Sequence, residues 1–250
     1  NMVPNKLYLN QGDLKFNDIS ESAGISGDDR WYSGVTLIDI NNDGFLDIYC
    51  SVAGKNEPNN NVLYINNQDN TFTEKAKEYG IDDDGYSMHA TFFDYDKDGD
   101  LDLYVANYPP TSFTAPVDYY KYKIDNHNER ESDHLYRNEG DHFVDVTEES
   151  GISNFGLSLG IVASDFNNDG YPDAMCWAGK GYLFLNQKRT SLTNISEKLP
   201  DLPTKVSLAA SMGDFNGDGL VDLYVGGYEG PGYLTDVMYF NTAENNFKEV

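Results

Sequence analysis

Short runs of aromatic and β-branched residues recur along the whole chain, and Gly, Asn and Asp bound each run. Runs of this length and composition are typical of strands. No segment has the apolar spacing of an amphipathic helix, and Thr147–Ser150 has room for one helical turn at most. The pattern therefore predicts an all-β protein.

The runs recur in one order, which predicts units of four strands each. The expected first strands lie at 35–38, 90–93, 161–163 and 209–212, and the expected second strands at 46–50, 101–106, 174–177 and 221–225. The expected third strands, each ending in Asn, lie at 62–66, 134–138, 182–186 and 237–241. The expected fourth strands lie at 72–74, 143–146, 192–195 and 247–250.

The spacing of the units suits the four-stranded blades of a β-propeller. We expect one domain over 1–250 that holds about four and a half antiparallel blades. The half blade is 5–20, and the full blades are 31–76, 86–147, 157–196 and 206–250. The opening half has only a third and a fourth strand. The chain is then a piece of a larger propeller, which we favour, or the ring closes unusually, or another molecule supplies the missing strands.

Each expected first strand leads into a nine-residue loop of the form Asp-x-Asp/Asn-x-Asp-Gly-x-x-Asp. Oxygen ligands that alternate around a sharp Gly turn are how a chain wraps a hard cation. We expect four Ca²⁺ sites, with side-chain ligands at positions one, three, five and nine and a backbone carbonyl at position seven. The predicted ligands are Asp39, Asn41, Asp43, Phe45, Asp47, Asp94, Asp96, Asp98, Asp100, Asp102, Asp165, Asn167, Asp169, Tyr171, Asp173, Asp214, Asn216, Asp218, Leu220 and Asp222.

Other interpretations of the loops fit less well. An EF-hand needs a Glu at position twelve, where this chain has Cys50, Val105, Cys176 and Val225. Magnesium keeps its waters in octahedral geometry, and zinc prefers nitrogen and sulfur ligands. Asx-rich turns without metal are the remaining alternative, but they would leave several carboxylates repelling one another in every unit. We expect calcium to staple each hairpin and to take no part in catalysis. Cys50 and Cys176 replace a buried Val, so we expect no disulfide between them.

The chain carries 42 Asp and Glu against 17 Lys and Arg, a net charge of −25. This balance excludes the basic stripe that nucleic acid needs, and it disfavours an anionic membrane surface. No apolar run reaches membrane-spanning length. Calcium sites this polar bind weakly, so they fill where calcium is abundant. We therefore expect a secreted, periplasmic or cell-surface protein.

The loops and the segments around them resemble a known family. The loop, preceded by a strand that contains Gly or Ala, is similar to the FG-GAP/VCBS repeats of integrin-α-type β-propellers. The wider pattern Leu-Tyr-x-Asn, Phe-x-Asp-Val/Ile and Glu-x-x-Gly-Ile occurs at 7–10, 16–19 and 21–25, and again at 135–138, 143–146 and 148–152. It resembles bacterial exported proteins related to the cartilage acidic protein/ASPIC group. The resemblance implies a calcium propeller that serves adhesion, scaffolding, glycan binding or occasionally polysaccharide lysis.

Loops at the end of the blades opposite the calcium hairpins are the expected binding face. The insertion 107–132, which separates the second and third strands of the second full blade, lies on this face. The candidate ligand-binding aromatics there are Trp31, Tyr86, Tyr108, Trp177 and Tyr228. Aromatic faces beside polar groups suit a glycan or an extended protein segment. The alternative is that these rings pack the ends of the blades.

The rival function is an enzyme, a polysaccharide lyase built on a calcium propeller. A lyase needs a base and a charge-neutralising group in one groove, and only His89, Lys180 and Arg30 are candidates. The segment Gly156-Leu157-Ser158-Leu159-Gly160 matches a nucleophile elbow, which requires a helix after the serine. A strand is expected there instead. The expected function is therefore non-catalytic: a calcium-stabilised module for adhesion or for protein or glycan binding.

Overall fold

The structure is a computed structural model that describes residues 4–54, 58–109, 119, 122–123, 125–126, 128–152, 158–178, 180–189, 191–199, 207–227, 236–242 and 246–250. It contains one two-stranded sheet and four four-stranded antiparallel sheets, and in each of the larger sheets the strands lie side by side in chain order. None of the helices in these ranges is long and apolar enough to cross a membrane.

The strands group into an N-terminal hairpin and four units. The hairpin is β1 (Tyr8–Asn10) with β2 (Phe16–Asp18). Unit 1 is β3 (Trp31–Ile38), β4 (Asp47–Ala53), β5 (Val62–Asn66) and β6 (Phe72–Glu74). Unit 2 is β7 (Ser87–Phe93), β8 (Asp102–Asn107), β9 (His134–Asn138) and β10 (Phe143–Asp145). Unit 3 is β11 (Gly160–Ser164), β12 (Asp173–Ala178), β13 (Lys180–Asn186) and β14 (Leu192–Asn194). Unit 4 is β15 (Ser207–Gly213), β16 (Asp222–Gly227), β17 (Val237–Thr242) and β18 (Asn246–Glu249).

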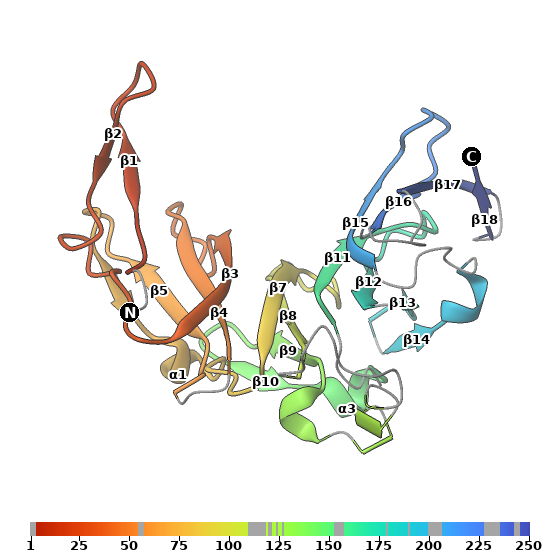
Figure 1. Cartoon of the computed structure of the whole chain (residues 1–250), viewed down its shortest axis with the longest axis horizontal. Coiled ribbons are helices and arrows are strands. Elements are labelled where there is room, and N and C mark those ends of the chain that lie inside the picture. The colour runs from red at the N-terminus through yellow and green to blue at the C-terminus, as the bar shows by residue number, and fades with distance from the viewer. Residues whose placement is uncertain are drawn as a thin grey trace.

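The five sheets follow one another along an open arc (Figure 1). The predicted all-β class and the four-stranded antiparallel units are confirmed. The described strands do not close into a ring, so the closed propeller stays a prediction.

The hydrophobic core lies between neighbouring sheets, where apolar side chains of one unit pack against those of the next. Between units 2 and 3 the core includes Tyr104, Leu135, Ile161 and Phe184, all at most 3% exposed. Cys176 lies in the same layer, and Cys50 lies in the layer between unit 1 and the hairpin. Both cysteines are buried and neither forms a disulfide, as their equivalence to Val predicts.

Short helical segments lie in the connections between strands. They are α1 (Ala76–Tyr79), α3 (Thr147–Ser150) and the 3-10 turns η1 (Glu129–Glu131) and η2 (Ser196–Lys198). All of these but η1, which is inside unit 2, lie between units. Helix α1 ends at Gly80 (φ 75°), where a Cβ would lie 3.0 Å from the carbonyl oxygen of Phe143 in the next unit. Helix α3 ends in the same way at Gly151, where a Cβ would lie 3.0 Å from the carbonyl oxygen of Leu192. Glycine is needed at both places because the linker passes close to the next fourth strand.

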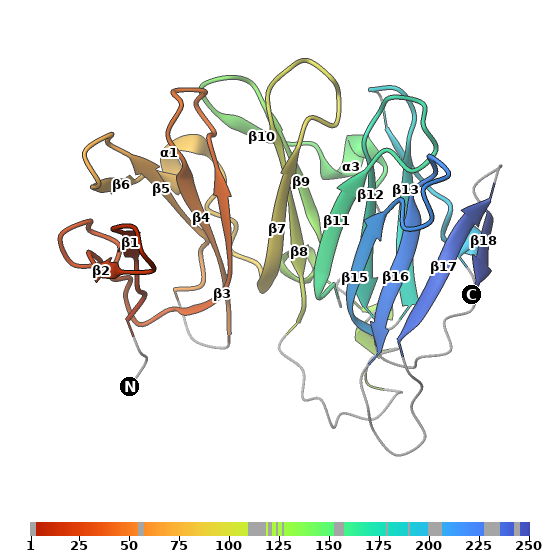
Figure 2. The same cartoon turned by 90° about the horizontal axis from the view of Figure 1, so that it is seen from above.

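The two ends of the units carry different connections. The loops that join first and second strands lie along one edge of the row of sheets (Figure 2). The connection from β8 to β9, which contains the insertion 107–132, leaves from the opposite edge. We call these edges the loop end and the far end.

Candidate metal centres and the far end

The four loops 39–47, 94–102, 165–173 and 214–222 follow one backbone path. In each loop the first Asp accepts hydrogen bonds from the N–H groups of the fifth and sixth residues. For Asp39 the donors are Asp43, at 3.0 Å, and Gly44, at 2.9 Å. The same two bonds form at Asp94, Asp165 and Asp214. The loop sequence thus folds the same way in every unit.

The third and fifth side chains are fixed in turn. The oxygen of Asn41 accepts the N–H of Asp43 at 3.1 Å, and Asp96 accepts the N–H of Asp98 at 3.2 Å. The fifth carboxylate then accepts the N–H of the seventh residue, as Asp43 does from Phe45 at 2.9 Å. This bond lowers the pKa of Asp43. Backbone donors therefore orient the oxygens at positions one, three and five.

Two residues of each loop have left-handed backbone conformations. The fourth position is Asn42, Lys97, Asn168 or Gly217, with φ between 55° and 78°. The sixth is always Gly, with φ between 87° and 104°. A side chain at the sixth position would strain the turn, which explains the glycine there.

The ninth Asp is buried and joins three parts of its unit. In unit 2 Asp102 is 0% exposed, and its two oxygens accept the N–H groups of Tyr95 at 2.9 Å and Asn138 at 2.9 Å. Asp47, Asp173 and Asp222 accept the equivalent pairs. Burial raises the pKa of Asp47, and it raises the pKa of Asp102 and of Asp173 to about 7. The sequence predicted a ligand here but missed this clamp between the loop and the third strand.

The donor set of the loops fits a hard divalent cation. In loop 94–102 one oxygen each of Asp94, Asp96 and Asp102 lies within 4.8 Å of the others. Asn41, Asn167 and Asn216 occupy the place of Asp96 in the other loops and offer an amide oxygen. Asp100 is half-buried, and its Oδ1 has no hydrogen-bond partner among the described residues. Burial and the neighbouring Asp98 raise the pKa of Asp100 to about 6. Oxygen-only ligands and excess negative charge match Ca²⁺. The backbone-carbonyl role of position seven stays a prediction.

Neighbouring loops are tied to each other. The Asn186 side chain, from the end of β13, donates to the carbonyl oxygen of Tyr95 in the loop of unit 2, at 2.7 Å. Asn241 reaches Phe166 in the loop of unit 3 in the same way, at 3.1 Å. The Lys97 ammonium lies 4.9 Å from the centre of the Tyr171 ring, from one loop to the next.

The far end contains a second repeated contact that sequence reasoning missed. Asp133, just before β9, accepts the N–H of Asn107 at 2.8 Å, the hydroxyl of Tyr104 at 3.0 Å and the hydroxyl of Ser158 in unit 3 at 2.7 Å. Burial raises the pKa of Asp133 to about 6. Ser158 belongs to the nucleophile-elbow match, and β11 rather than a helix follows it. It therefore serves as a tie between units.

Unit 1 forms the same tie with Asn61, which contacts Val52, Tyr49 and Ser87. In unit 3 the equivalent positions are Met175 and Gly181, and a Cβ on Gly181 would lie 3.1 Å from the Met175 methyl carbon. Units 1 and 2 thus have both members of the tie, a Tyr on the second strand and an Asn or Asp before the third strand. Unit 3 has neither member. The sequence could have revealed this tie, because the Tyr lies two residues after the ninth Asp in both units and is lost in unit 3 together with its partner.

A buried ion pair lies beside this tie. His134 Nδ1 contacts Asp83 Oδ2, which also accepts the Tyr136 hydroxyl at 2.7 Å. Burial lowers the pKa of His134, but the bond to Asp83 outweighs burial and the pKa rises to about 9. Burial raises the pKa of Asp83, but the His134 bond and charge outweigh it, and the pKa lies below its ordinary value. The pair is therefore charged near neutral pH.

The four candidate aromatics in the described residues differ in exposure. Trp31 is 63% exposed, as expected for a binding ring. Tyr86 and Tyr108 are half-buried, and the Arg130 guanidinium lies 5.7 Å from the centre of the Tyr86 ring. Trp177 is only 8% exposed, and a Cβ on Gly160 would overlap its ring, so the expectation of an exposed Trp177 was wrong. Tyr228 lies outside the described residues.

The candidate lyase residues are not shown to share a groove. His89 is half-buried on β7, its Nδ1 has no partner among the described residues, and burial lowers its pKa. Arg30 forms an ion pair with Asp28, with Nε 3.1 Å from Oδ2. The backbone of Lys180 belongs to β13, and its side chain lies outside the described part of the structure.

Comparison with known proteins gives two findings and one negative result. The model of the FG-GAP-like repeat matches residues 2–50 and 51–105. The V. cholerae biofilm matrix protein Bap1 is similar in structure, with a TM-score of 0.47 and 12% sequence identity. The matched region is 87% of this chain and 30% of that protein, so the chain spans less than a third of its length. No curated protein matches the sequence.

The matched repeats contain the first loop and the second loop, so the family model and the geometry agree on the same residues. The finer resemblance to the cartilage acidic protein/ASPIC group is not among these matches and stays a prediction. The chain carries FG-GAP-like repeats over residues 2–105.

Proposed function

We propose that this chain is part of a calcium-stabilised extracellular β-propeller that binds a protein or a glycan without catalysis. One observation carries the calcium part. The loops of all four units orient their first, third and fifth oxygens through the same backbone hydrogen bonds. Such a set of preoriented oxygens needs little rearrangement to coordinate Ca²⁺.

The charge of the chain supports the same proposal. Each loop gathers several carboxylates, and the net charge is −25. A bound divalent ion offsets their repulsion, and weak sites of this kind fill at extracellular calcium concentrations. FG-GAP-like repeats agree with an adhesion-type module. The partner is then held by the far end, where the units differ most.

Calcium binding is tested by titration calorimetry and by thermal unfolding in 5 mM CaCl₂ and in EDTA. At calcium concentrations about 100 times the dissociation constant, each site adds about 2.7 kcal/mol to the free energy of unfolding. We expect EDTA to lower Tm by more than 10 °C and MgCl₂ to restore little of it. An unchanged Tm in EDTA contradicts the calcium proposal.

Binding and catalysis are separated by a second experiment. The protein is added to a glycan array and, in parallel, to acidic polysaccharides in a lyase assay that follows the absorbance of unsaturated products. We expect retention on the array or on an extracellular protein ligand, and no absorbance change. Turnover that is lost in H89A would replace the binding proposal with a lyase.

A further inference from the structure

Units 1 and 2 can be compared residue by residue at the far end, because their strands pair in the same register. Val62 pairs with Cys50, and His134 pairs with Val105. Cys50 and Val105 both lie three residues past the ninth Asp of their loops. Two steps further along, Tyr64 pairs with Glu74, and Tyr136 pairs with Asp145. Val62 therefore takes the place of His134, and Tyr64 takes the place of Tyr136.

The acidic residue that pairs with His134 also has an equivalent in unit 1. Asp83 Oδ1 accepts the N–H of Gly85 at 2.8 Å and the hydroxyl of Ser87 at 3.4 Å. Asp28 Oδ1 accepts the N–H of Arg30 at 3.0 Å and the hydroxyl of Tyr32 at 3.3 Å. The two carboxylates thus lie at the same point of the linker that precedes each unit.

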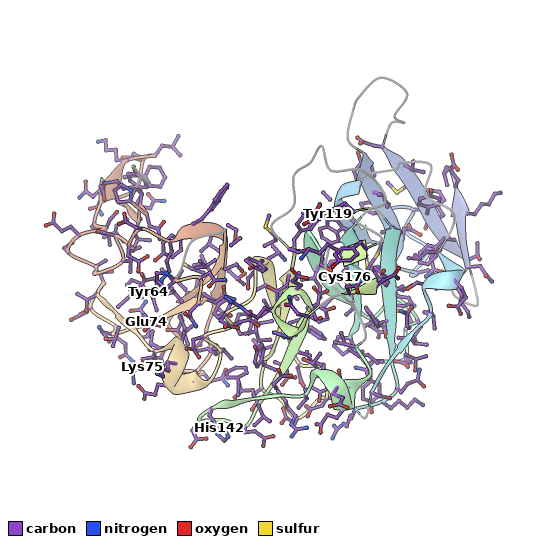
Figure 3. The ribbon with its side chains drawn as sticks, turned by 60° about the horizontal axis from the view of Figure 1, so that its bottom comes forward. Tyr64, Glu74, Lys75, Tyr119, His142 and Cys176 are labelled. Atoms are coloured by element: carbon purple, nitrogen blue, oxygen red, sulfur yellow. The ribbon has the colours of Figure 1, made fainter. Side chains whose placement is uncertain are left out.

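The two units differ at the position beside the carboxylate and the Tyr ring, which is His134 in unit 2 and Val62 in unit 1. In unit 2 the His134 ring lies beside both Asp83 and Tyr136: its Nδ1 contacts Asp83 Oδ2, and its centre is 5.9 Å from that of the Tyr136 ring. In unit 1 the shorter side chain of Val62 borders an open cavity of about 320 Å³. Its wall includes Asp28, Arg30, Tyr32, Val62, Tyr64 and Glu74. Figure 3 shows Tyr64 and Glu74 close together in unit 1.

The polar groups of this cavity are mainly hydrogen-bond acceptors. Glu74 uses Oε1 to accept the N–H of Ala76 at 2.8 Å, and no bond is found at its Oε2 in the described residues. Among the described residues of the wall, Arg30 is the only cation, and it is already engaged. Its Nε lies 3.1 Å from Asp28, and its Nη1 donates to the carbonyl oxygen of Asn60 at 3.0 Å. Two carboxylates against one guanidinium leave a net charge of −1.

We propose that the cavity of unit 1 binds a small planar organic cation, an imidazolium group, in the place that His134 occupies in unit 2. The carboxylates supply charge-assisted acceptors for its N–H groups, and Tyr64 offers an aromatic ring to the cation. The site goes beyond the calcium-stabilised module and does not depend on calcium. The same chemistry is available from a free imidazole compound or from the histidine side chain of a partner protein.

The direct test uses imidazole as the probe. The protein, saturated with calcium at pH 6, is titrated with imidazole and followed by ¹H–¹⁵N NMR. We expect shifts at the amides of residues 28–32 and 62–64 and a dissociation constant of about 1–10 mM, in the range for so small a ligand. Pyrazole, a neutral ring of the same size, should bind at least tenfold more weakly. Unchanged spectra at 50 mM imidazole, or equal binding of pyrazole or acetate, overturn the proposal.

Two matched variants exchange the residues that units 1 and 2 have at this equivalent position. V62H should place an imidazole beside Asp28, raise Tm and weaken imidazole binding at least tenfold. H134V should open the same cavity in unit 2 and lower Tm, and 20 mM imidazole should restore part of that loss. Undiminished imidazole binding in V62H overturns the proposal, and this variant decides the matter alone if H134V does not fold.

The source of the cation is tested with Nα-acetylhistidine methylamide, which presents the ring as a peptide does. Binding within threefold of imidazole assigns the site to a histidine side chain of a partner. Binding at least tenfold weaker assigns it to a free imidazole compound.

Discussion

The loop end and the far end of the units use the same sheets differently. At the loop end every unit repeats the same hydrogen bonds, from Asp39 in unit 1 to Asp222 in unit 4. At the far end the units diverge: the position of His134 in unit 2 is Val62 in unit 1, and the position of Asp133 in unit 2 is Gly181 in unit 3. Every loop must close the same hairpin, whereas the far end varies without opening the sheet. Sequence variation therefore concentrates where a partner could be recognised.

The largest effect is expected from the ninth Asp, since it stabilises the loop end even without a cation. Removal of its carboxylate in D102A leaves the N–H groups of Tyr95 and Asn138 buried without an acceptor. Each orphaned group costs about 1–3 kcal/mol. We expect D102A to lose about 3 kcal/mol of unfolding free energy in EDTA, measured by urea denaturation.

The control is D98A in the same loop. Asp98 is exposed, and in the described residues the one backbone N–H group that it accepts is that of Asp100, at 3.1 Å. We expect D98A to abolish calcium binding by loop 94–102 in a titration while its stability in EDTA stays close to wild type. Equal losses in the two variants would mean that the ninth Asp acts only as a calcium ligand.

A smaller effect is expected from pH at the far end. The folded-state pKa of His134, about 9, lies above the ordinary value of about 6.5. Its ion pair therefore contributes fully below pH 6.5, and the contribution is lost as pH rises through about 9. We expect unfolding free energy to fall by about 2–3 kcal/mol between pH 7 and pH 10. H134Q keeps a hydrogen-bond donor for Asp83 but cannot titrate, so its unfolding free energy should depend less on pH. An equally steep pH dependence in H134Q would mean that other groups cause the loss of stability.

The comparison also shows which features the sequence could predict. The units and the loops could be predicted from local patterns, because alternating carboxylates and a fixed Gly determine the backbone conformation of a single turn. The order of strands followed as well, since each third strand ends at an Asn whose N–H group donates to the ninth Asp.

Features of the far end depend on residues that are distant in the sequence. Asp83 and His134 are 51 positions apart, and Asp133 meets Ser158 across a boundary between units. Trp177 was expected on the binding face because it begins the connection from the second to the third strand, but the bare backbone of Gly160 leaves room to bury it. Only tertiary packing decides these cases.

A third prediction exchanges the two forms of the far-end tie. D133A leaves the Asn107 N–H without an acceptor, but it also removes a buried carboxylate whose pKa is raised to about 6. These effects oppose each other, so we expect a loss of about 1–2 kcal/mol at pH 7. D133N copies Asn61 and should be at least as stable as wild type at pH 8.

The sign of the pH dependence is part of this test. The pKa of Asp133 is raised in the folded state, so its favourable contribution is present below about pH 3.9 and lost as pH rises through about 6. The advantage of D133N over wild type in urea denaturation should therefore grow between pH 5 and pH 8. An advantage that shrinks over this range contradicts the burial argument.

The smallest effect is expected where loops of neighbouring units touch. Asn186 donates to Pro172 in its own unit at 2.9 Å and to Tyr95 in the preceding unit at 2.7 Å. Asn66 makes only the first kind of bond in the described residues, to Leu46 at 3.1 Å. N186A should therefore cost about 1 kcal/mol more than N66A. Because the extra bond ends in loop 94–102, amide hydrogen exchange in that loop should accelerate in N186A and not in N66A. Equal exchange in both variants would mean that each loop is held by its own unit alone.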